Sequence, residues 1–469
     1  MSTLPYQRPQ ISVLTLAVSL LMLPPAFGHS LEEAVAHTLD THPEIRIAFN
    51  RFKVREEQVN QAYSGYMPTV DITAGYGWEQ TDSPSTRRKA GLGDVSQGGT
   101  MELYRGEASV SLKQMLFDGF YTSSEVNRYS SEASAEQWAL YGAAEDMALD
   151  VTKVYVNYIR AKQILILSER NLQSHKDIYS QIKQRTDSGL GSIADLSQIS
   201  GRLARANANV ISAKNNINDA RAQYLSVTEL EPDNLTLPVP DTQMMPIDLN
   251  NSIAIATQDH PVLKSAANDI IAAKSERDST FSNYYPQISL EISSQWNNDT
   301  QGEDGYSAIS SQNVNGYNNN LVGMVRMRYN LFSGGKDLHR EKEAAYKINE
   351  AKEIRQRANR QVIEGVRLAW NAFEMLEPQK QFIRDHVIAA KRTQVAYAQQ
   401  FNLGQRTLLD LLDTENELFE ARKDYLQTEY DEIIAYYRVF NATGQLLDSL
   451  RVTRPEVWRG ENDDEGGVK

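Results

Sequence analysis

Cysteine is absent from the 469-residue chain. The chain therefore forms no disulfide and no thiolate metal site, and it offers no cysteine for lipid attachment. Long apolar runs are also missing. No stretch approaches the 18 or so uninterrupted apolar residues of a membrane-spanning helix, so none is predicted.

A concentrated basic face is missing too. The net charge is −13, and acidic and basic residues alternate along most of the chain, so nucleic acid is not an expected partner. The seven histidines are scattered without an HExxH motif. Gly334-Gly335-Lys336-Asp337 lacks both the upstream glycine and the Ser/Thr of a P-loop. We therefore expect no enzyme activity, no cofactor and no metal.

Residues 1–28 are predicted to be an export signal peptide. Arg8 supplies the positive charge, Ile11–Leu23 is mostly apolar, and Ala26 and Gly28 are the small residues of a cleavage site before His29. An uncleaved membrane anchor is the alternative, but the apolar run is short for a span of about 20 residues.

The chain contains two copies of one unit. His42-Pro43 and the later Pro68 recur 218 residues on as His260-Pro261 and Pro286. LFDG (residues 116–119) recurs 215 residues on as LFSG (residues 331–334). A fixed period identifies structural repeats. We expect four segments after the signal peptide: repeat 1 at 29–231, a proline-rich linker at 232–246, repeat 2 at 247–450 and an acidic C-terminal tail at 451–469, whose closing GENDDEGG stretch is expected to be solvated.

Each repeat is expected to contain a pair of strands, because apolar and polar residues alternate with period two. The pattern predicts strands at 69–79 and 104–117 in repeat 1, and at 287–297 and 321–332 in repeat 2. Polar, glycine-bearing loops are predicted between the members of each pair. Each strand would have one apolar face.

Long helices follow the strands, since proline and glycine become rare while apolar residues recur every three or four positions. A helix of about 66 residues, roughly 100 Å long, is expected from Phe120, and a second from Gly335. A shorter helix of about 36 residues returns to Thr228, and its counterpart in repeat 2 is predicted at Leu408–Thr443. The helix before the strands and the returning helix together match the long one in length, so they are expected to stack end to end beside it as a coiled-coil hairpin. Pro378 is expected to kink or interrupt its helix.

Four strands cannot close a membrane barrel, which needs about eight or more. Three chains would supply twelve strands and leave room for a lumen. The alternative is a soluble antiparallel sheet with one wet face, which shows the same alternation. Tyr76, Trp78 and Trp296 lie near strand ends and suit an aromatic belt at a membrane interface.

Taken together, the duplicated strand pairs and helical hairpins resemble the TolC family of outer-membrane efflux and secretion proteins. The resemblance covers about 31–450, and its most specific segment is FNLGQRTLLDLLDTENELFEAR, Phe401–Arg422, which is similar to the family's turn at the periplasmic tip. It implies an α+β membrane protein: a homotrimer with a 12-stranded β-barrel and an α-helical periplasmic tunnel.

The resemblance also implies site residues. Asp410 and Asp413 match two aspartates that ring the periplasmic mouth of the tunnel, where carboxylates favour cations. The alternative is that Thr407-x-x-Asp410, like Ser192-x-x-Asp195, is a helix-capping box. Asp413 has Gln198 as its repeat partner, so capping does not explain it.

In the family, polar links among an arginine, a tyrosine and an aspartate hold the mouth shut. Arg406 and Asp195 match two of these residues, and Phe401 takes the place of the tyrosine without its hydroxyl. A solvated arginine and a packed phenylalanine are the alternative. Opening is expected to untwist the hairpins at their turns, Gly189, Gly191 and Gly404.

The function that the resemblance implies is that of a passive conduit in a tripartite export system of the outer membrane. Its expected partners are a periplasmic membrane-fusion adaptor, an inner-membrane ABC transporter or RND pump, outer-membrane lipid, and an exported protein or small molecules. The missing lipidation cysteine favours type I protein secretion. The overall pattern of the chain is most similar to the branch that exports large biofilm adhesins. Multidrug efflux is the alternative, and a soluble periplasmic coiled-coil scaffold or adaptor is the alternative of another class.

Overall fold

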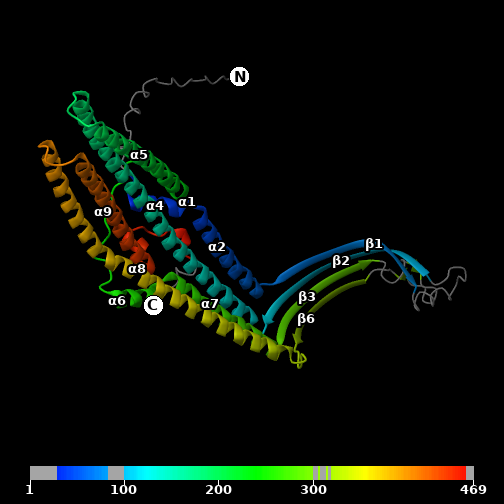
Figure 1. Cartoon of the computed structure of the whole chain (residues 1–469). Coiled ribbons are helices and arrows are strands. Elements are labelled where there is room, and N and C mark those ends of the chain that lie inside the picture. Colours follow the sequence, from blue (N-terminus) through cyan, green and yellow to red (C-terminus); the bar gives the residue numbers. More distant parts are fainter. Residues whose placement is uncertain (1–28, 83–99, 299–304, 307–312, 315–317, 461–469) are drawn as a thin grey trace, which may run out of the picture.

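The computed structural model describes residues 29–82, 100–298, 305–306, 313–314 and 318–460. The predicted signal peptide and residues 461–469 of the predicted tail lie outside the described residues. The molecule is a long helical bundle from one end of which a curved sheet projects at an angle (Figure 1).

Two helices of 67 residues each, α4 (Tyr121–Asp187) and α8 (Lys336–Asn402), run the length of the bundle. Each turns back into a helix of 36 residues, α5 (Ile193–Thr228) or α9 (Leu408–Thr443). Both α2 (Pro43–Tyr63) and α5 pack on α4, while α7 (Pro261–Thr280) and α9 pack on α8. The predicted end-to-end stacking beside each long helix is therefore confirmed. Contacts between α4 and α7 join the two halves.

Local chemistry begins these helices in the same way in both halves. Pro43 and Pro261 occupy the first helical turn, where their missing amide hydrogen costs nothing. The preceding histidines cap the helices: the Nδ1 atoms of His42 and His260 accept from the amides of Glu44 and Val262, at 3.2 and 3.3 Å. None of the helices within the described residues is both long and apolar enough to cross a membrane.

Pro378 does not interrupt α8, contrary to one of the two predicted outcomes. Contacts with α9 hold the helix on both sides of the proline. Before it, the rings of Phe373 and Tyr436 lie 4.8 Å apart. After it, Lys380 forms an ion pair with Glu432. Tertiary packing therefore offsets the hydrogen bond that proline removes.

The projecting sheet has the antiparallel order β1-β2-β3-β6. Its strands span Thr69–Asp82, Thr100–Phe117, Gln287–Asn298 and Asn318–Arg328. All four extend into the predicted loops, β3 by one residue only, and the short pair β4 (Gly305–Tyr306) and β5 (Asn313–Val314) lies within the second of these loops. β6 ends at Arg328, so the prediction of a strand up to residue 332 is wrong.

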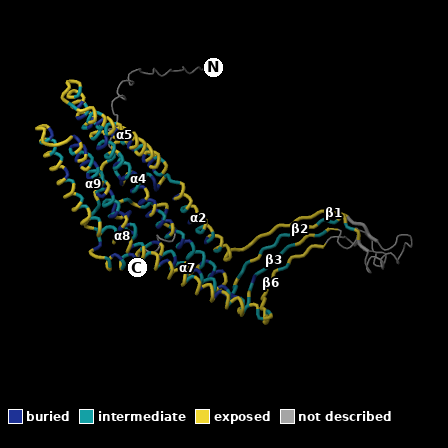
Figure 2. The backbone as a smooth tube through the Cα atoms, viewed as in Figure 1, coloured by how far each residue is buried: buried dark blue, intermediate teal, exposed yellow. Residues whose placement is uncertain are grey.

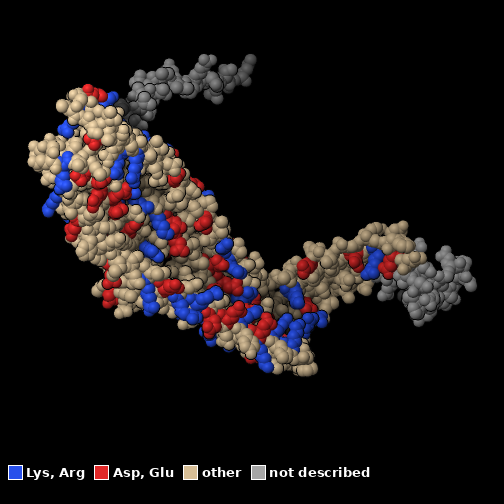
Figure 3. Space-filling model, viewed as in Figure 1, with Lys and Arg blue, Asp and Glu red and all other residues tan. Residues whose placement is uncertain are grey.

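One face of this sheet is apolar and the other is polar. The register aligns Ile72 with Val110 and Leu112 with Ile292 on one face. The opposite face aligns Lys113 with Glu291, and Glu291 pairs with Arg326 at 2.8 Å. Figure 2 shows that the edge strands β1 and β6 are largely exposed in the single chain, whereas β2 and β3 between them are mostly half-buried, and Figure 3 shows that charged residues gather mainly over the helices.

The main apolar core surrounds the middle of α4. Residues from α1 (Leu31–Thr41), α10 (Leu446–Ser449) and the linker pack around Tyr155, whose side chain is fully buried. The Tyr155 hydroxyl lies 2.9 Å from the carbonyl oxygen of His29 and 2.8 Å from that of Thr236, and it accepts from the amide of Thr236 at 3.0 Å. The linker therefore lies fixed against α4. Across it, α6 (Leu249–Asp259) begins the second half.

The predicted C-terminal tail begins with a packed segment, while the stretch after Gly460 that is predicted to be solvated lies outside the described residues. Residues 451–460 lie against α2 and α4, and they include the short helix η3 (Glu456–Trp458). Trp458 is buried among the core residues, and its carbonyl oxygen accepts from Gln137 at 3.0 Å. Arg454 lies 3.5 Å from the buried carboxylate of Glu145.

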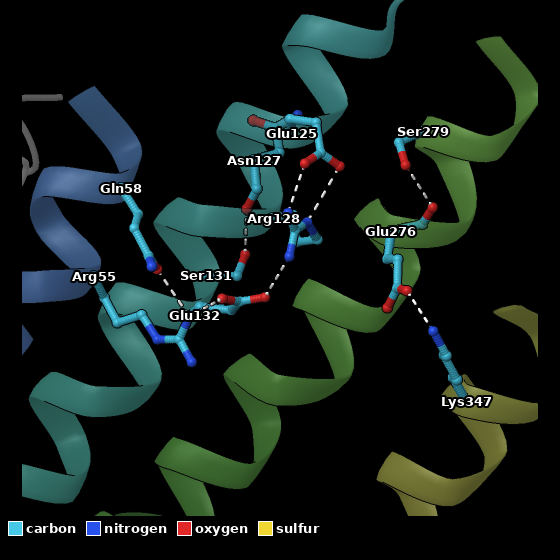
Figure 4. A network of polar contacts seen from close by, with 10 residues as sticks. All are labelled: Arg55, Gln58, Glu125, Asn127, Arg128, Ser131, Glu132, Glu276, Ser279 and Lys347. Carbon is cyan, nitrogen blue, oxygen red and sulfur yellow. Dashed lines mark hydrogen bonds and ion pairs between the residues drawn. The ribbon is translucent and has the colours of Figure 1, made fainter. Parts of the chain in front are cut away.

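Near the sheet, ion pairs link neighbouring helices (Figure 4). Arg55 of α2 contacts Glu132 of α4 at 2.9 Å, and Glu132 also pairs with Arg128 at 3.0 Å. On the other side, Lys347 of α8 contacts Glu276 of α7 at 2.7 Å. The Arg55–Glu132 and Lys347–Glu276 pairs thus link neighbouring helices where the strands begin.

Candidate functional site

The candidate site is the tip of the two helical hairpins, at the end of the bundle opposite the sheet (Figure 1). Gly189 and Gly404 take φ angles of 73° and 75° in the two turns, a left-handed conformation that favours glycine. Gly191 is required for another reason. A Cβ there would lie 2.8 Å from the Thr186 backbone nitrogen.

A compact apolar cluster joins both hairpins at this tip. It draws residues from α4, α5, α8 and α9: Ile178, Ile182, Ile199, Phe401, Leu408, Leu411 and Leu412. Phe401 is buried in it, and the Arg185 guanidinium lies 5.3 Å from the ring centroid. Within one chain Phe401 is therefore a packed core residue, which agrees with the alternative interpretation.

Asp410 caps α9. Its Oδ2 accepts from the Thr407 amide at 3.3 Å, while the Asp410 amide donates to Thr407 Oγ1 at 3.2 Å, which completes a capping box. Arg406 lies 3.9 Å from the same carboxylate. The side chain is still 37% exposed, so the capping role leaves its charge within reach of water.

Asp413 lies one turn further along α9 and forms an ion pair with Arg202 of α5 at 2.7 Å. The Asp413 side chain is 57% exposed and that of Arg202 is 27% exposed. This pair directly links α5 and α9, one helix from each hairpin. Since both groups reach water, the pair stabilises the tip by no more than about 1 kcal/mol.

Asp195 and Arg406 do not meet within the described part of one chain. Arg406 Nε donates to Gln400 at 3.0 Å, and its guanidinium lies 4.3 Å from the Tyr397 ring centroid. Asp195 lies in the first turn of α5, where the Ser192 hydroxyl accepts from the Ala194 amide at 3.1 Å. The reciprocal capping box that Ser192-x-x-Asp195 would form is therefore not made.

At the other end of the molecule, the predicted belt residues share the apolar face of the sheet. Tyr76, Trp78 and Trp296 are 79%, 56% and 45% exposed. The rings of Tyr76 and Tyr104 lie nearly parallel, with their centroids 6.5 Å apart. Among the described residues, no cluster of three or more histidine, aspartate or glutamate side chains could hold a metal ion.

Sequence reasoning missed the partners of the tip residues. Arg202 follows Asp195 by seven residues, so it lies on the same face of α5. This spacing does not indicate its contact with Asp413, because that contact joins residues 211 positions apart in different hairpins. The contact of Tyr397 with Arg406 lies within the second hairpin.

Comparison with known proteins assigns the fold and the family. A family model described as "Outer membrane efflux protein" matches residues 35–226 and again 253–445. Outer membrane efflux protein BepC of Brucella suis is 23% identical over 90% of this chain and 86% of its own length. Outer membrane protein TolC of Vibrio cholerae is 22% identical over 90% and 92%.

Alkaline protease secretion protein AprF of Pseudomonas aeruginosa is 21% identical over 90% of this chain and 86% of its own length. A solved structure of CusC, described as forming a transmembrane channel, superposes with a TM-score of 0.72 at 14% identity, over 88% of this chain and 91% of that one. The fold is thus that of the TolC-like channels.

The chain belongs to the outer membrane efflux protein family, because the family model matches most of its length in two successive segments. The family consists of channel proteins of the outer membrane. This protein is accordingly an outer-membrane channel of the efflux and secretion type.

Proposed function

We propose that three copies of this chain form one conduit: a 12-stranded β-barrel in the outer membrane, continued by an α-helical tunnel in the periplasm. Two repeats, 29–231 and 247–450, would each give two strands and one hairpin to the wall. The observation that carries this proposal is the four-stranded sheet, which has one apolar and one polar face. Among the described residues, no strand of this chain covers its two edges, β1 and β6. An open edge is costly in lipid.

The proposed transport role is type I protein secretion, with a periplasmic adaptor and an inner-membrane ABC transporter. It is supported by the likeness to a relative named for alkaline protease secretion over 90% of this chain and by the missing cysteine. Large adhesins are the proposed cargo. Multidrug efflux with an RND pump is the second candidate, favoured by the likeness to an efflux protein.

For the tip, we propose that Asp410 and Asp413 from three copies surround the periplasmic mouth. Both side chains reach water and lie on one face of α9, three residues apart. The proposed gate residues Asp195, Arg406 and Phe401 would act between copies, with Gly189, Gly191 and Gly404 as the points of bending. The passage itself needs no chemistry beyond these charges.

Neutralising the tip carboxylates tests this proposal. Asp410→Asn with Asp413→Asn should lower the cation-over-anion permeability ratio in planar bilayers roughly fivefold or more, since a carboxylate 4 Å from an ion in water contributes about 1 kcal/mol. Asparagine keeps an oxygen for the cap. The ratio is measured from reversal potentials across a salt gradient.

Two matched variants sharpen this test. Arg202→Gln frees the Asp413 charge and should raise the same ratio. Asp431→Asn removes a carboxylate of α9 about 30 Å from the tip and should leave the ratio near wild type. An unchanged ratio in the double variant would remove the proposed ring, and a protein that is monomeric by native mass in detergent would refute the trimer.

A further inference from the structure

The turn between β2 and α4 is seated tightly on the other half of the same chain. Gly119 is buried with a φ of 73°, and a Cβ added there would lie 2.7 Å from the Ser282 carbonyl oxygen and 2.8 Å from Tyr285 Cβ. The rings of Phe117, Phe120 and Tyr285 close over the contact edge to face, with centroids 5.5 to 6.4 Å apart. The LFDG turn therefore has a complete socket.

The LFSG turn of the second half has the same backbone. Gly334 and Gly335 take φ angles of 70° and 85°, which match the 73° and 70° of Gly119 and Phe120. In each turn, an aspartate and a hydroxyl residue four positions apart form a hydrogen bond. In the first turn Thr122 donates to the Asp118 carboxylate, and in the second Ser333 donates to Asp337, so the aspartate and the hydroxyl residue have exchanged positions. The second turn is thus already shaped for a socket.

No such socket meets the second turn among the described residues. Nothing lies within 4 Å of a Cβ built on Gly334, and Leu331 and Phe332 are each 83% exposed. An exposed leucine and phenylalanine side by side on a formed turn are unusual for a surface that remains in water.

A matching socket exists in the first half, where none of the described residues occupies the position that the LFDG turn takes in the second half. The socket of the first turn is the single turn η2 (Phe281–Tyr284), in which the Tyr285 amide donates to the Ser282 carbonyl at 3.1 Å. Its repeat partner is η1 (Ser64–Tyr66), in which the Met67 amide donates to the Ser64 carbonyl at 2.9 Å. Ser282 is buried, whereas Ser64 is exposed and Met67 is 65% exposed.

We propose that the LFSG turn of one copy seats on η1 of a second copy of this chain, as LFDG seats on η2 within one copy. Gly334 then lies against the neighbour's Ser64 carbonyl, and Phe332 packs beside Tyr66 and Met67. The occupant is a second copy because turn and socket are two halves of a contact that the chain already makes internally. This inference rests on the proposed homotrimer.

If the contact between copies repeats the contact within one copy, it also sets the register of the strands that pair between copies. Within the chain, β2 pairs with β3 so that Lys113 faces Glu291. Their repeat partners are Arg328 of β6 and Thr73 of β1, which lie on the two edges of the sheet. The joint between copies therefore places Arg328 of one copy opposite Thr73 of the next. Within one chain three strand spacings, about 14 Å, separate β6 from β1.

Cysteine pairs test this register directly, because the wild-type chain contains no cysteine. Full-length Thr73→Cys/Arg328→Cys, treated with a short bismaleimide, is expected to give covalent two- and three-chain species on denaturing gels. Thr69→Cys/Arg328→Cys is four residues out of register, about 13 Å, and should give roughly tenfold less. Lys113→Cys/Glu291→Cys is the control that links within one chain.

A glycine pair tests the seat. Gly334→Ala should raise the protein concentration needed for half-assembly roughly tenfold, because its Cβ meets the neighbour's backbone. Gly335→Ala introduces the same left-handed strain. Its repeat partner in the first turn, Phe120, already carries a side chain at this position, so a Cβ on residue 335 should leave assembly as in wild type. Helix content by circular dichroism shows that both variants are folded.

The outcomes separate this inference from the proposed function. Predicted links together with a selective effect of Gly334→Ala support it. A trimer by native mass whose out-of-register pair links as well as the predicted pair overturns the register, and equal effects of the two alanines overturn the seat; in both cases the trimer stands. A monomer by native mass overturns the proposed function itself.

Discussion

Replacing Tyr155 with alanine is expected to lower the free energy of unfolding of the helical bundle by about 3–5 kcal/mol. The side chain is fully buried in the main core, so its removal leaves a cavity that the surrounding helices fill only in part. Its hydroxyl also contacts the backbone of His29 and Thr236. The variant therefore loosens α1 and the linker from α4 together. Denaturant unfolding in detergent, followed by far-ultraviolet circular dichroism, measures the effect.

Two conservative variants divide this effect into its parts. Tyr155→Phe keeps the ring and removes the hydroxyl, which leaves the Thr236 amide without its acceptor, so a loss of about 1–3 kcal/mol is expected. Tyr158→Phe removes a hydroxyl that makes no hydrogen bond within the described residues, and it should change stability by less than about 0.5 kcal/mol. Equal stability of Tyr155→Phe and wild type would show that the hydroxyl does not hold the linker.

Much of the fold could be predicted because the chain is repeated and its patterns are strong. The long helices lack proline and glycine over many turns, and α9 was predicted residue for residue, from Leu408 to Thr443. Strand positions followed from period-two alternation. Their ends could not be placed, since a residue such as Gln80 has no strong preference for a strand and is held in β1 by its pairing with Glu102.

The candidate site was harder, because its contacts are non-local. Asp410 could be assigned a cap from Thr407, which is three residues away. The pairing of Asp413 with Arg202 has no local signal, and neither has the burial of Phe401 between two hairpins. The acidic composition after Gly460 also concealed that Trp458, two residues earlier, is a core residue. Composition describes solvation on average, whereas a single large apolar side chain decides whether a segment docks.

Glu145 is a buried acid that should make stability depend on pH. Its carboxylate accepts from the Leu446 and Leu447 amides at 2.8 and 3.3 Å and lies 3.5 Å from Arg454, at the point where α4 holds α10 and the C-terminal segment. Burial raises its pKa from 4.5 to about 7, against the opposing effects of Arg454 and the two amides. Below about pH 7 the folded protein therefore favours the neutral acid.

The sign of the expected pH dependence follows from this shift. Between about pH 4.5 and 7 the folded protein holds a proton that the unfolded chain releases, so stability from this group is greatest near pH 4.5 and is lost as pH rises to about 7. A shift of this size in pKa corresponds to about 3 kcal/mol in the free energy of unfolding.

Glu145→Gln cannot titrate, so the stability of wild type minus that of the variant should fall by about this amount between pH 5 and 8, measured by denaturant unfolding at fixed protein concentration. Asp269→Asn removes another acid whose pKa burial raises, and this control should leave the part due to Glu145 intact. A difference independent of pH would mean that Glu145 stays ionised in the fold, held by Arg454 and the α10 amides as a permanent anchor of the C-terminal segment.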